Sequence, residues 1–243
     1  MQTNHQTAHP SLSSSLWAAT LFIAVLWCIK SAEVLFGFSL HSLGVYPGEY
    51  SGLLGILTAP LIHGSYEHLT GNSMALFLLV SALFYGYPRS KLWVFAIVWL
   101  FSGMGTWIFA RESFHFGASG LTHGLFFYLL TISILRRDKR SILLMMIAFF
   151  MYGGMVMTIF PREEHISFEY HFFGAVAGFI CAFLFRRVDP TPVEKQYTWE
   201  KHPDIEDQVI GDEWRVNQDT VHSDNDDEIS EVNNADDPRK RFH

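Results

Sequence analysis

Long apolar stretches separated by short polar segments dominate the first 190 residues of the chain. A bilayer core about 30 Å thick requires about 20 apolar residues per helix. The pattern therefore predicts an all-α, polytopic membrane protein with a bundle of six transmembrane helices. The predicted helices cover residues 16–37, 69–86, 91–110, 117–135, 141–160 and 166–185.

The first predicted helix contains two charged residues, Lys30 and Glu33. Residues three positions apart lie on one face of a helix, and charges inside a membrane are costly unless they pair. We therefore expect these side chains to form an ion pair. No small-residue cleavage site follows this helix, which we interpret as a retained anchor.

Charge divides the chain into two parts. The net charge is −7, but residues 190–243 carry 15 Asp and Glu against 6 Lys and Arg, which leaves +2 for residues 1–189. A tail this polar cannot bury enough apolar surface to offset the conformational entropy that it would lose on folding. We predict a short cytoplasmic segment over 1–15, a membrane domain over 16–189 and a disordered cytoplasmic tail over 190–243. The tail either binds a cytoplasmic partner or only solvates the chain, and we favour solvation.

Lys and Arg residues indicate the orientation, because basic connections stay in the cytoplasm. Eight basic residues follow the second, fourth and sixth predicted helices, whereas only Arg111 and Arg162 lie on the other side. The eight are Arg89, Lys91, Arg136, Arg137, Lys139, Arg140, Arg186 and Arg187. The bias predicts a multi-pass protein of the plasma (cytoplasmic) membrane with both termini in the cytoplasm.

Polar residues occur at one level near the outer boundary. In this topology the second, fourth and sixth helices start on the outer side. Their first turns hold His68 and Asn72, Ser119, and His171, all within about one to two turns of the boundary at 1.5 Å per residue. Because polar groups are costly in lipid, we expect these side chains, and His123 with them, to face the bundle interior or a water-filled cavity.

Ser119 is the candidate nucleophile. It lies among Gly117, Ala118 and Gly120 at the entry to an apolar helix. There its hydroxyl is uncrowded and faces free backbone N–H groups, both of which a reaction through an oxyanion requires. Taken alone, the motif is more typical of a plain turn or of close helix packing than of a nucleophile.

His171 precedes two small residues, Gly174 and Gly178, that predict a close-packing ridge on the sixth helix. The imidazole and this ridge share roughly one side of the helix. If the ridge meets the fourth helix, His171 can reach the Ser119 hydroxyl. The alternative is a buried histidine bonded to a backbone carbonyl.

Histidines near the outer side could instead bind a metal. The spacing differs from the zinc motif His-Glu-x2-His, and no carboxylate enters a span near them. With only two cysteines, Cys28 and Cys181, neither a disulfide framework nor a cysteine metal cluster is expected. We predict no metal and no cofactor. The histidines concerned are His63, His68, His115, His123, His165 and His171.

Three motifs in chain order resemble the rhomboid family of intramembrane serine proteases over about residues 16–186. The resemblance implies that Ser119 attacks a peptide carbonyl and that His171 takes its proton and later gives it to the leaving amine, without a carboxylate third member. The motifs are His63-x4-His68-x3-Asn72, Gly117-Ala118-Ser119-Gly120 and His171-x2-Gly174-x3-Gly178.

The resemblance also implies an oxyanion site and a substrate class. The oxyanion would bind His68, Asn72 and the Ser119 backbone N–H, in the turn formed with Gly117 and Ala118, while His63 would support them. Substrates would be single-span or membrane-anchored proteins that enter laterally from the lipid bilayer. Cleavage would occur near the outer face, after a small residue. No nucleic acid is implied as a partner.

The chain departs from the family pattern at two places. Many members have Trp-Arg in the first outer loop, where this chain has Leu54-Gly55. His123 also replaces a tyrosine that often stacks on the histidine equivalent to His171, so its protonation would influence that of His171. Two other functions stay open: a non-proteolytic rhomboid-like protein that binds membrane clients, and a histidine-rich metal or haem carrier.

Overall fold

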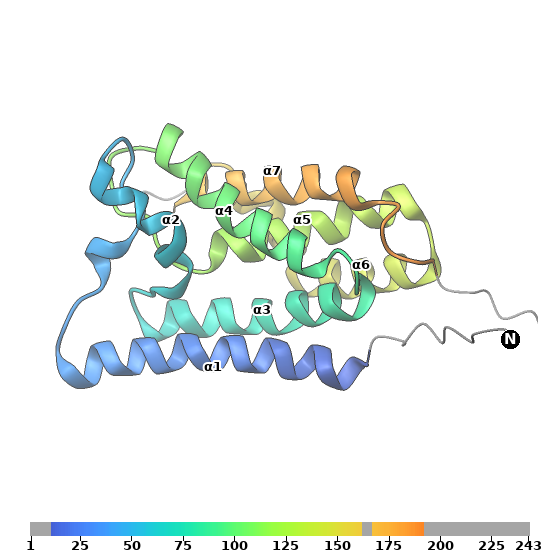
Figure 1. Ribbon diagram of the computed structural model, residues 1–243, viewed down its shortest axis with the longest axis horizontal. Coiled ribbons are helices and arrows are strands. Elements are labelled where there is room, and N and C mark those ends of the chain that lie inside the picture. Colours follow the sequence, from blue (N-terminus) through green and yellow to red (C-terminus); the bar gives the residue numbers. More distant parts are fainter. Residues whose placement is uncertain (1–10, 162–166, 192–243) are drawn as a thin grey trace, which may run out of the picture. The chain divides into compact units, whose positions relative to one another are not determined.

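The computed structural model describes residues 11–161 and 167–191, and this part of the chain is helical (Figure 1). The predicted all-α fold is confirmed, and each of the six expected long helices is present. The predicted segment 1–15 lies mostly, and the predicted tail almost wholly, outside the described residues. The helices are α1 (Leu12–Phe36), α2 (Gly55–Thr58), α3 (Tyr66–Gly86), α4 (Lys91–Phe109), α5 (Ser119–Arg136), α6 (Lys139–Tyr152) and α7 (Phe168–Phe185).

Helix α5 is the centre of the bundle. It packs against α3, α4, α6 and α7, whereas α1 packs mainly along α3 (Figure 1). Twelve of the 18 residues of α5 are buried, so this helix faces protein on most sides. That position explains its composition, because a helix enclosed by other helices can carry Ser, Thr and His where a lipid-facing helix would need apolar side chains.

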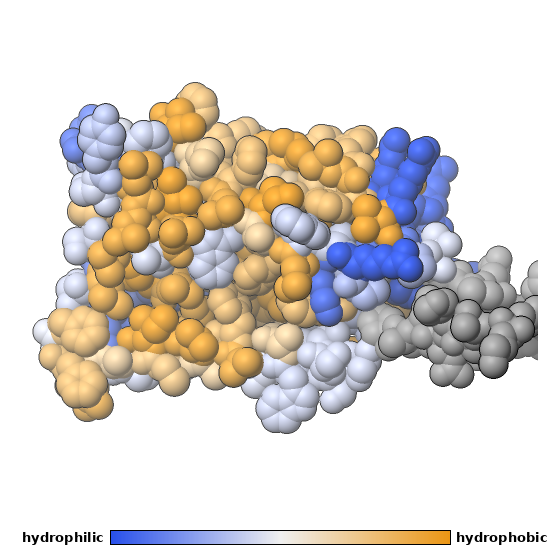
Figure 2. Space-filling model, in the orientation of Figure 1, coloured by the Kyte–Doolittle hydropathy of each residue, from blue (hydrophilic) through white to orange (hydrophobic). Residues whose placement is uncertain are grey.

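Five helical stretches in the described residues are long and apolar enough to cross a membrane. α5, which corresponds to the fourth of the six predicted spans, is not among these five, because its enclosed position lets it carry Ser, Thr and His residues. Figure 2 shows hydrophobic residues across most of one face and the most hydrophilic ones at the end where α3, α5 and α7 finish. The five stretches are α1, α3, α4, α7 and Lys139–Ile159, which joins α6 to the 3-10 helix η4 (Gly153–Ile159).

Helices α5 and α7 touch through their backbones. A Cβ atom added to Gly174 would lie 2.0 Å from the carbonyl oxygen of Gly120, and one added to Gly178 would lie 1.9 Å from that of Gly124. Real Cβ atoms do not approach so closely, so only glycine allows this packing. The helix that carries His171 is thus in direct backbone contact with the helix that begins at Ser119.

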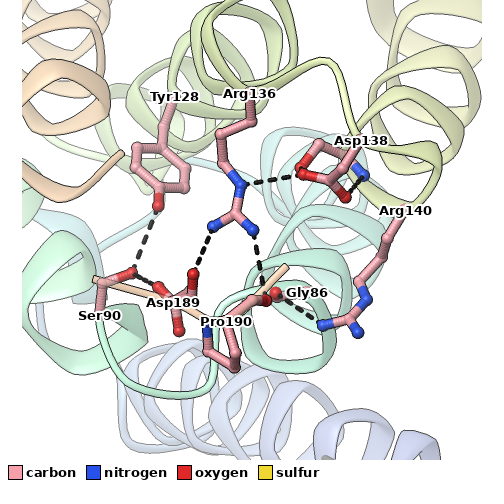
Figure 3. Close-up of polar contacts among 9 residues, drawn as sticks. Gly86, Ser90, Tyr128, Arg136, Asp138, Arg140, Asp189 and Pro190 are labelled. Atoms are coloured by element: carbon pink, nitrogen blue, oxygen red, sulfur yellow. Dashed lines mark hydrogen bonds and ion pairs between the residues drawn. The ribbon is translucent and has the colours of Figure 1, made fainter. Parts of the chain in front are cut away.

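A polar cluster fastens the helix ends at one end of the bundle (Figure 3). The buried carboxylate of Asp189 accepts hydrogen bonds from the Arg89 N–H at 2.7 Å and the Ser90 hydroxyl at 2.5 Å. Arg136 donates to the backbone carbonyls of Asp189 and Pro190 at 3.1 and 3.3 Å. The α3–α4 connection, the end of α5 and the chain beyond α7 therefore meet, and their basic residues share one end.

Asp138 explains why α6 can begin after only two connecting residues beyond the end of α5. Its carboxylate accepts hydrogen bonds from the Ser141 N–H at 3.1 Å and the Ser141 hydroxyl at 2.7 Å, which caps the first turn. It also pairs with Arg136 at 2.9 Å. Burial raises the pKa of Asp138, but these hydrogen bonds outweigh burial and hold the pKa below its ordinary value.

The predicted ion pair in α1 is confirmed. The Lys30 ammonium lies 2.9 Å from the Glu33 carboxylate, and both side chains are buried. Lys30 also donates to the carbonyl of Gly64 at 3.2 Å, and Glu33 accepts from the Leu40 N–H at 3.0 Å. The pair therefore ties the end of α1 to the segment that leads into α3.

The connection between α1 and α3 consists largely of short helical turns. These turns are η1 (His41–Leu43), η2 (Tyr50–Leu53), α2 and η3 (Ala59–Leu61). α2 packs on α4. A Cβ atom on Gly55 would lie 2.3 Å from the Gly44 backbone, whereas Leu54 is 53% exposed. In the Leu54-Gly55 pair, which stands where many family members have Trp-Arg, Gly55 thus makes a tight backbone contact and Leu54 faces outward.

Candidate active site

The N-terminal ends of α3, α5 and α7 lie opposite the polar cluster. They surround a cavity of about 590 Å³. His68 and Asn72 line it from α3, Ser119 from α5 and His171 from α7. Ser119 and His68 are partly exposed, whereas Asn72 and His171 are buried. The structure thus brings together the four residues that the topology places at one level.

The turn before Ser119 is held by hydrogen bonds from two of its backbone N–H groups. The Gly117 N–H donates to the Ala59 carbonyl at 2.9 Å, and the Ala118 N–H donates to Nε2 of His63 at 3.3 Å. Gly117 has φ +113°, and a Cβ atom there would lie 2.6 Å from Cε1 of His68, so this position requires glycine. The Ser119 N–H begins α5 and has no acceptor one turn earlier, which leaves it available to an anion.

His63 lies behind this turn and is 1% exposed. Because its Nε2 accepts from Ala118, the ring carries its proton on Nδ1. Burial lowers the pKa of His63 to about 4, so the ring is neutral near pH 7. Its ring centroid lies 5.3 Å from that of His68 in an edge-to-face contact. The position lets His63 fix both the turn and the neighbouring imidazole.

His171 uses one ring nitrogen for structure. Its Nδ1 lies 3.0 Å from the Thr158 carbonyl oxygen. A carbonyl can only accept, so Nδ1 carries the proton and Nε2 of the neutral ring has a free lone pair. The two interpretations of His171, a base and a buried histidine bonded to a carbonyl, are therefore compatible, with one nitrogen for each.

The Ser119 hydroxyl forms no hydrogen bond with His171 in this conformation of the described residues, although both side chains line the cavity. Catalytic hydrogen bonds are often long without substrate and tighten in the reacting complex. The arrangement supplies a hydroxyl, a ring nitrogen that can accept a proton, and N–H donors at a helix start.

His123 also lines the cavity and stacks on His171. The ring centroids are 3.9 Å apart and the planes differ by 9°. Nδ1 of His123 donates to the Ser119 carbonyl at 2.7 Å, and its Nε2 lies 2.7 Å from the Thr158 hydroxyl. The departure at this position thus places two parallel imidazoles beside each other.

Two residues of this region make contacts that no sequence motif indicates. Buried His115 bonds the Ser167 hydroxyl at 2.6 Å and the Arg111 carbonyl at 3.0 Å, which joins the α4–α5 connection to the start of α7. Burial lowers the pKa of His115. Thr158 contacts two histidines that are distant from it in the sequence. Neither residue belongs to a motif, so their roles depend on tertiary contacts.

The histidines are not grouped as metal ligands. Among residues 11–161 and 167–191, no set of three or more His, Cys, Asp or Glu is arranged to hold a metal ion. His165 lies outside the described residues. Ring nitrogens of His63, His115 and His123 instead bond to protein groups.

Comparison with known protein families identifies the family to which this chain belongs. The model of the Rhomboid domain matches residues 50–188, which is more than half of the chain. The chain belongs to the rhomboid family. This rhomboid is an integral, multi-pass membrane protein, and proteins of the family act on membrane-protein substrates within the bilayer.

Relatives of this rhomboid occur in several bacteria. Uncharacterized proteins of Mycobacterium bovis and Mycobacterium leprae are each 31% identical over 172 residues, which is 67% of this chain and 72% and 68% of those relatives. The putative rhomboid protease YdcA of Bacillus subtilis is 29% identical over 151 residues, 59% of this chain and 71% of YdcA. No solved structure matches significantly.

Proposed function

We propose that this rhomboid is an intramembrane serine endopeptidase that works through Ser119 and His171. The observation that carries the proposal is their place in one cavity, with the acceptor nitrogen of His171 free and the helix-start N–H of Ser119 available. A serine beside a neutral imidazole can be deprotonated as it attacks, which is how serine hydrolases activate a hydroxyl.

In the proposed reaction Oγ of Ser119 attacks the peptide carbonyl carbon while Nε2 of His171 takes the hydroxyl proton. The carbonyl oxygen becomes an oxyanion that the Ser119 N–H, His68 and Asn72 stabilise, and one such donor typically lowers the barrier by about 3–4 kcal/mol. The C–N bond then breaks, and His171 gives its proton to the leaving amine. Water hydrolyses the acyl-serine with His171 as base again.

The Thr158 carbonyl supplies the partner that a carboxylate provides in other serine proteases. It accepts from Nδ1–H of His171, so it fixes the tautomer and stabilises the imidazolium that forms when Nε2 takes a proton. A neutral carbonyl also costs less to bury than a carboxylate would. A two-residue catalytic system therefore suits an enclosed site.

The substrates of the proposed enzyme are single-span or membrane-anchored proteins that enter from the bilayer. The cavity lies at the helix starts, away from the basic end of the bundle, which under the positive-inside rule faces the cytoplasm. We therefore place cleavage near the outer face of the membrane and both termini in the cytoplasm. The cavity is large enough for several waters, which hydrolysis requires.

The test compares the parent with Ser119→Ala and His171→Ala, each purified in detergent and reconstituted with a single-span substrate. We expect both variants to unfold like the parent but to lose cleavage by at least about a thousandfold. A fluorophosphonate should label the parent and neither variant. Persistent cleavage by purified Ser119→Ala would end the proposal, and binding of the substrate without cleavage by the parent would favour a client-binding protein.

A further inference from the structure

One residue outside the family motifs contacts both stacked imidazoles. Thr158 accepts from Nδ1–H of His171 through its backbone carbonyl at 3.0 Å, and its hydroxyl lies 2.7 Å from Nε2 of His123. We propose that Thr158 is a positioning residue, which acts with His123 to hold the His171 ring in its reactive orientation. The inference rests on the proposed function and adds a residue to it.

The hydrogen-bond roles follow from the acceptors. Nδ1 of His123 faces the Ser119 carbonyl, so it must donate, and Nε2 of the neutral ring then carries a lone pair. The Thr158 hydroxyl has one proton and two available acceptors, Nε2 of His123 at 2.7 Å and the Met155 carbonyl at 3.0 Å. If the hydroxyl donates to Nε2 of His123, it uses the shorter contact, and the lone pairs of Nε2 and the hydroxyl oxygen do not face each other.

Both imidazoles then carry their protons on Nδ1. His123 is fixed at its two nitrogens, by Ser119 and by Thr158, so its ring plane is set independently of His171. The His171 ring lies parallel to it at 3.9 Å and is held at its own Nδ1. Rotation of His171 about its side-chain bonds would break both the stacking contact and the carbonyl hydrogen bond, so Nε2 stays directed away from them.

The position of Thr158 explains why it can hold both rings. It lies in η4, the segment after α6, which packs on the α7 helix of His171. The ring of His123 comes from α5, one turn after Ser119. A single residue of η4, which also lines the cavity, therefore connects the two helices of the proposed catalytic pair.

The test removes the hydroxyl and keeps the shape. We expect Thr158→Val to lower kcat on a reconstituted substrate, and the rate of fluorophosphonate labelling, by about fivefold to tenfold, the effect of one neutral hydrogen bond. KM should not change, because the Thr158 hydroxyl bonds His123 rather than substrate. Thr158→Ser, which keeps the hydroxyl, should restore both rates. An unchanged kcat in Thr158→Val would overturn the proposal.

A double-mutant cycle tests the route through His123. His123→Phe keeps an aromatic ring for stacking and removes both nitrogens. If the Thr158 hydroxyl acts through His123, Thr158→Val should have no further effect on kcat in the His123→Phe background. Full additivity of the two changes would contradict the proposed route.

Nitrogen NMR of histidine-labelled protein separates this inference from the proposed function, because it needs no substrate. With His171→Ala to assign the signals, the parent should show His171 protonated on Nδ1, and Thr158→Val should show a smaller fraction of that tautomer. If His171 in the parent protein is instead protonated on Nε2, the positioning role is refuted. If the parent neither cleaves nor reacts with fluorophosphonate, the proposed function fails while the tautomer result still decides the role of Thr158.

Discussion

Substitution of Gly178 by alanine tests whether backbone contact between α5 and α7 sets the geometry of the site. The added Cβ would lie 1.9 Å from the Gly124 carbonyl oxygen and 2.9 Å from the Tyr128 nitrogen. Ordinary contact begins at 3.4 Å, so the two helices must separate by roughly 1.5 Å, the difference between these distances. Neither neighbour is a flexible side chain that could move aside.

Two consequences of this separation can be given a magnitude. Overpacking of this kind typically costs about 1–3 kcal/mol of stability. Gly178 lies two helical turns, about 10 Å, beyond His171, so the substitution touches no cavity residue but moves the helix that carries His171, the proposed base. A displacement of about 1 Å in a reacting pair can cost about a hundredfold in rate. We therefore expect a strong loss of activity with a moderate loss of stability.

The assay is the rate of fluorophosphonate labelling of Ser119, measured with the unfolding midpoint in the same detergent. Gly154→Ala is the matched control, because an added Cβ there meets nothing within 4 Å. We expect the control to react and unfold like the parent. If Gly178→Ala also matched the parent in both measurements, the helices would not be in backbone contact and the reasoning would be wrong.

Two further predictions concern stability at the two ends of the bundle. Asp189→Ala leaves the Arg89 N–H without its acceptor and should lower the free energy of unfolding by about 1–3 kcal/mol; unchanged stability in chemical denaturation would show that the cluster contributes nothing. Lys30→Met leaves the buried Glu33 carboxylate unpaired and should cost about 3–5 kcal/mol, whereas the double variant Lys30→Met/Glu33→Gln should recover most of the loss. A double variant no more stable than the single one in the same measurement contradicts a buried charge as the cause.

The helices of the fold were predictable because hydrophobic length alone requires them in a membrane. Helices α5 and α7 begin at Ser119 and Phe168, each two residues after its predicted start, so Ser119 begins α5 and His171 lies in the first turn of α7. The shared level of the polar residues followed from the topology, since helices that run in one direction start at one boundary. The distribution of Lys and Arg was therefore as informative about the site as the motifs were.

Other features could not be predicted, for physical reasons. The turns between residues 41 and 61 are too short to show a helical period, and their positions depend on close contacts such as that between Gly55 and Gly44. Thr158 bonds His171 through a backbone carbonyl, which every residue type possesses. The sequence could place His123 near the cavity, but its parallel stacking on His171 depends on side-chain packing.

The enclosed position of α5 has a consequence for biosynthesis. Because α5 is not among the stretches apolar enough to cross a membrane alone, it depends on neighbouring helices to remain in the bilayer. Only Arg137 and Asp138 separate it from α6, whose continuation to Ile159 is the most apolar stretch of the described chain. We therefore expect the two helices to enter the membrane as a hairpin, before α7. A ribosome-bound chain that ends before α7 contains Ser119 but not His171, so under the proposed function the growing protein would not cleave other membrane proteins until α7 is inserted.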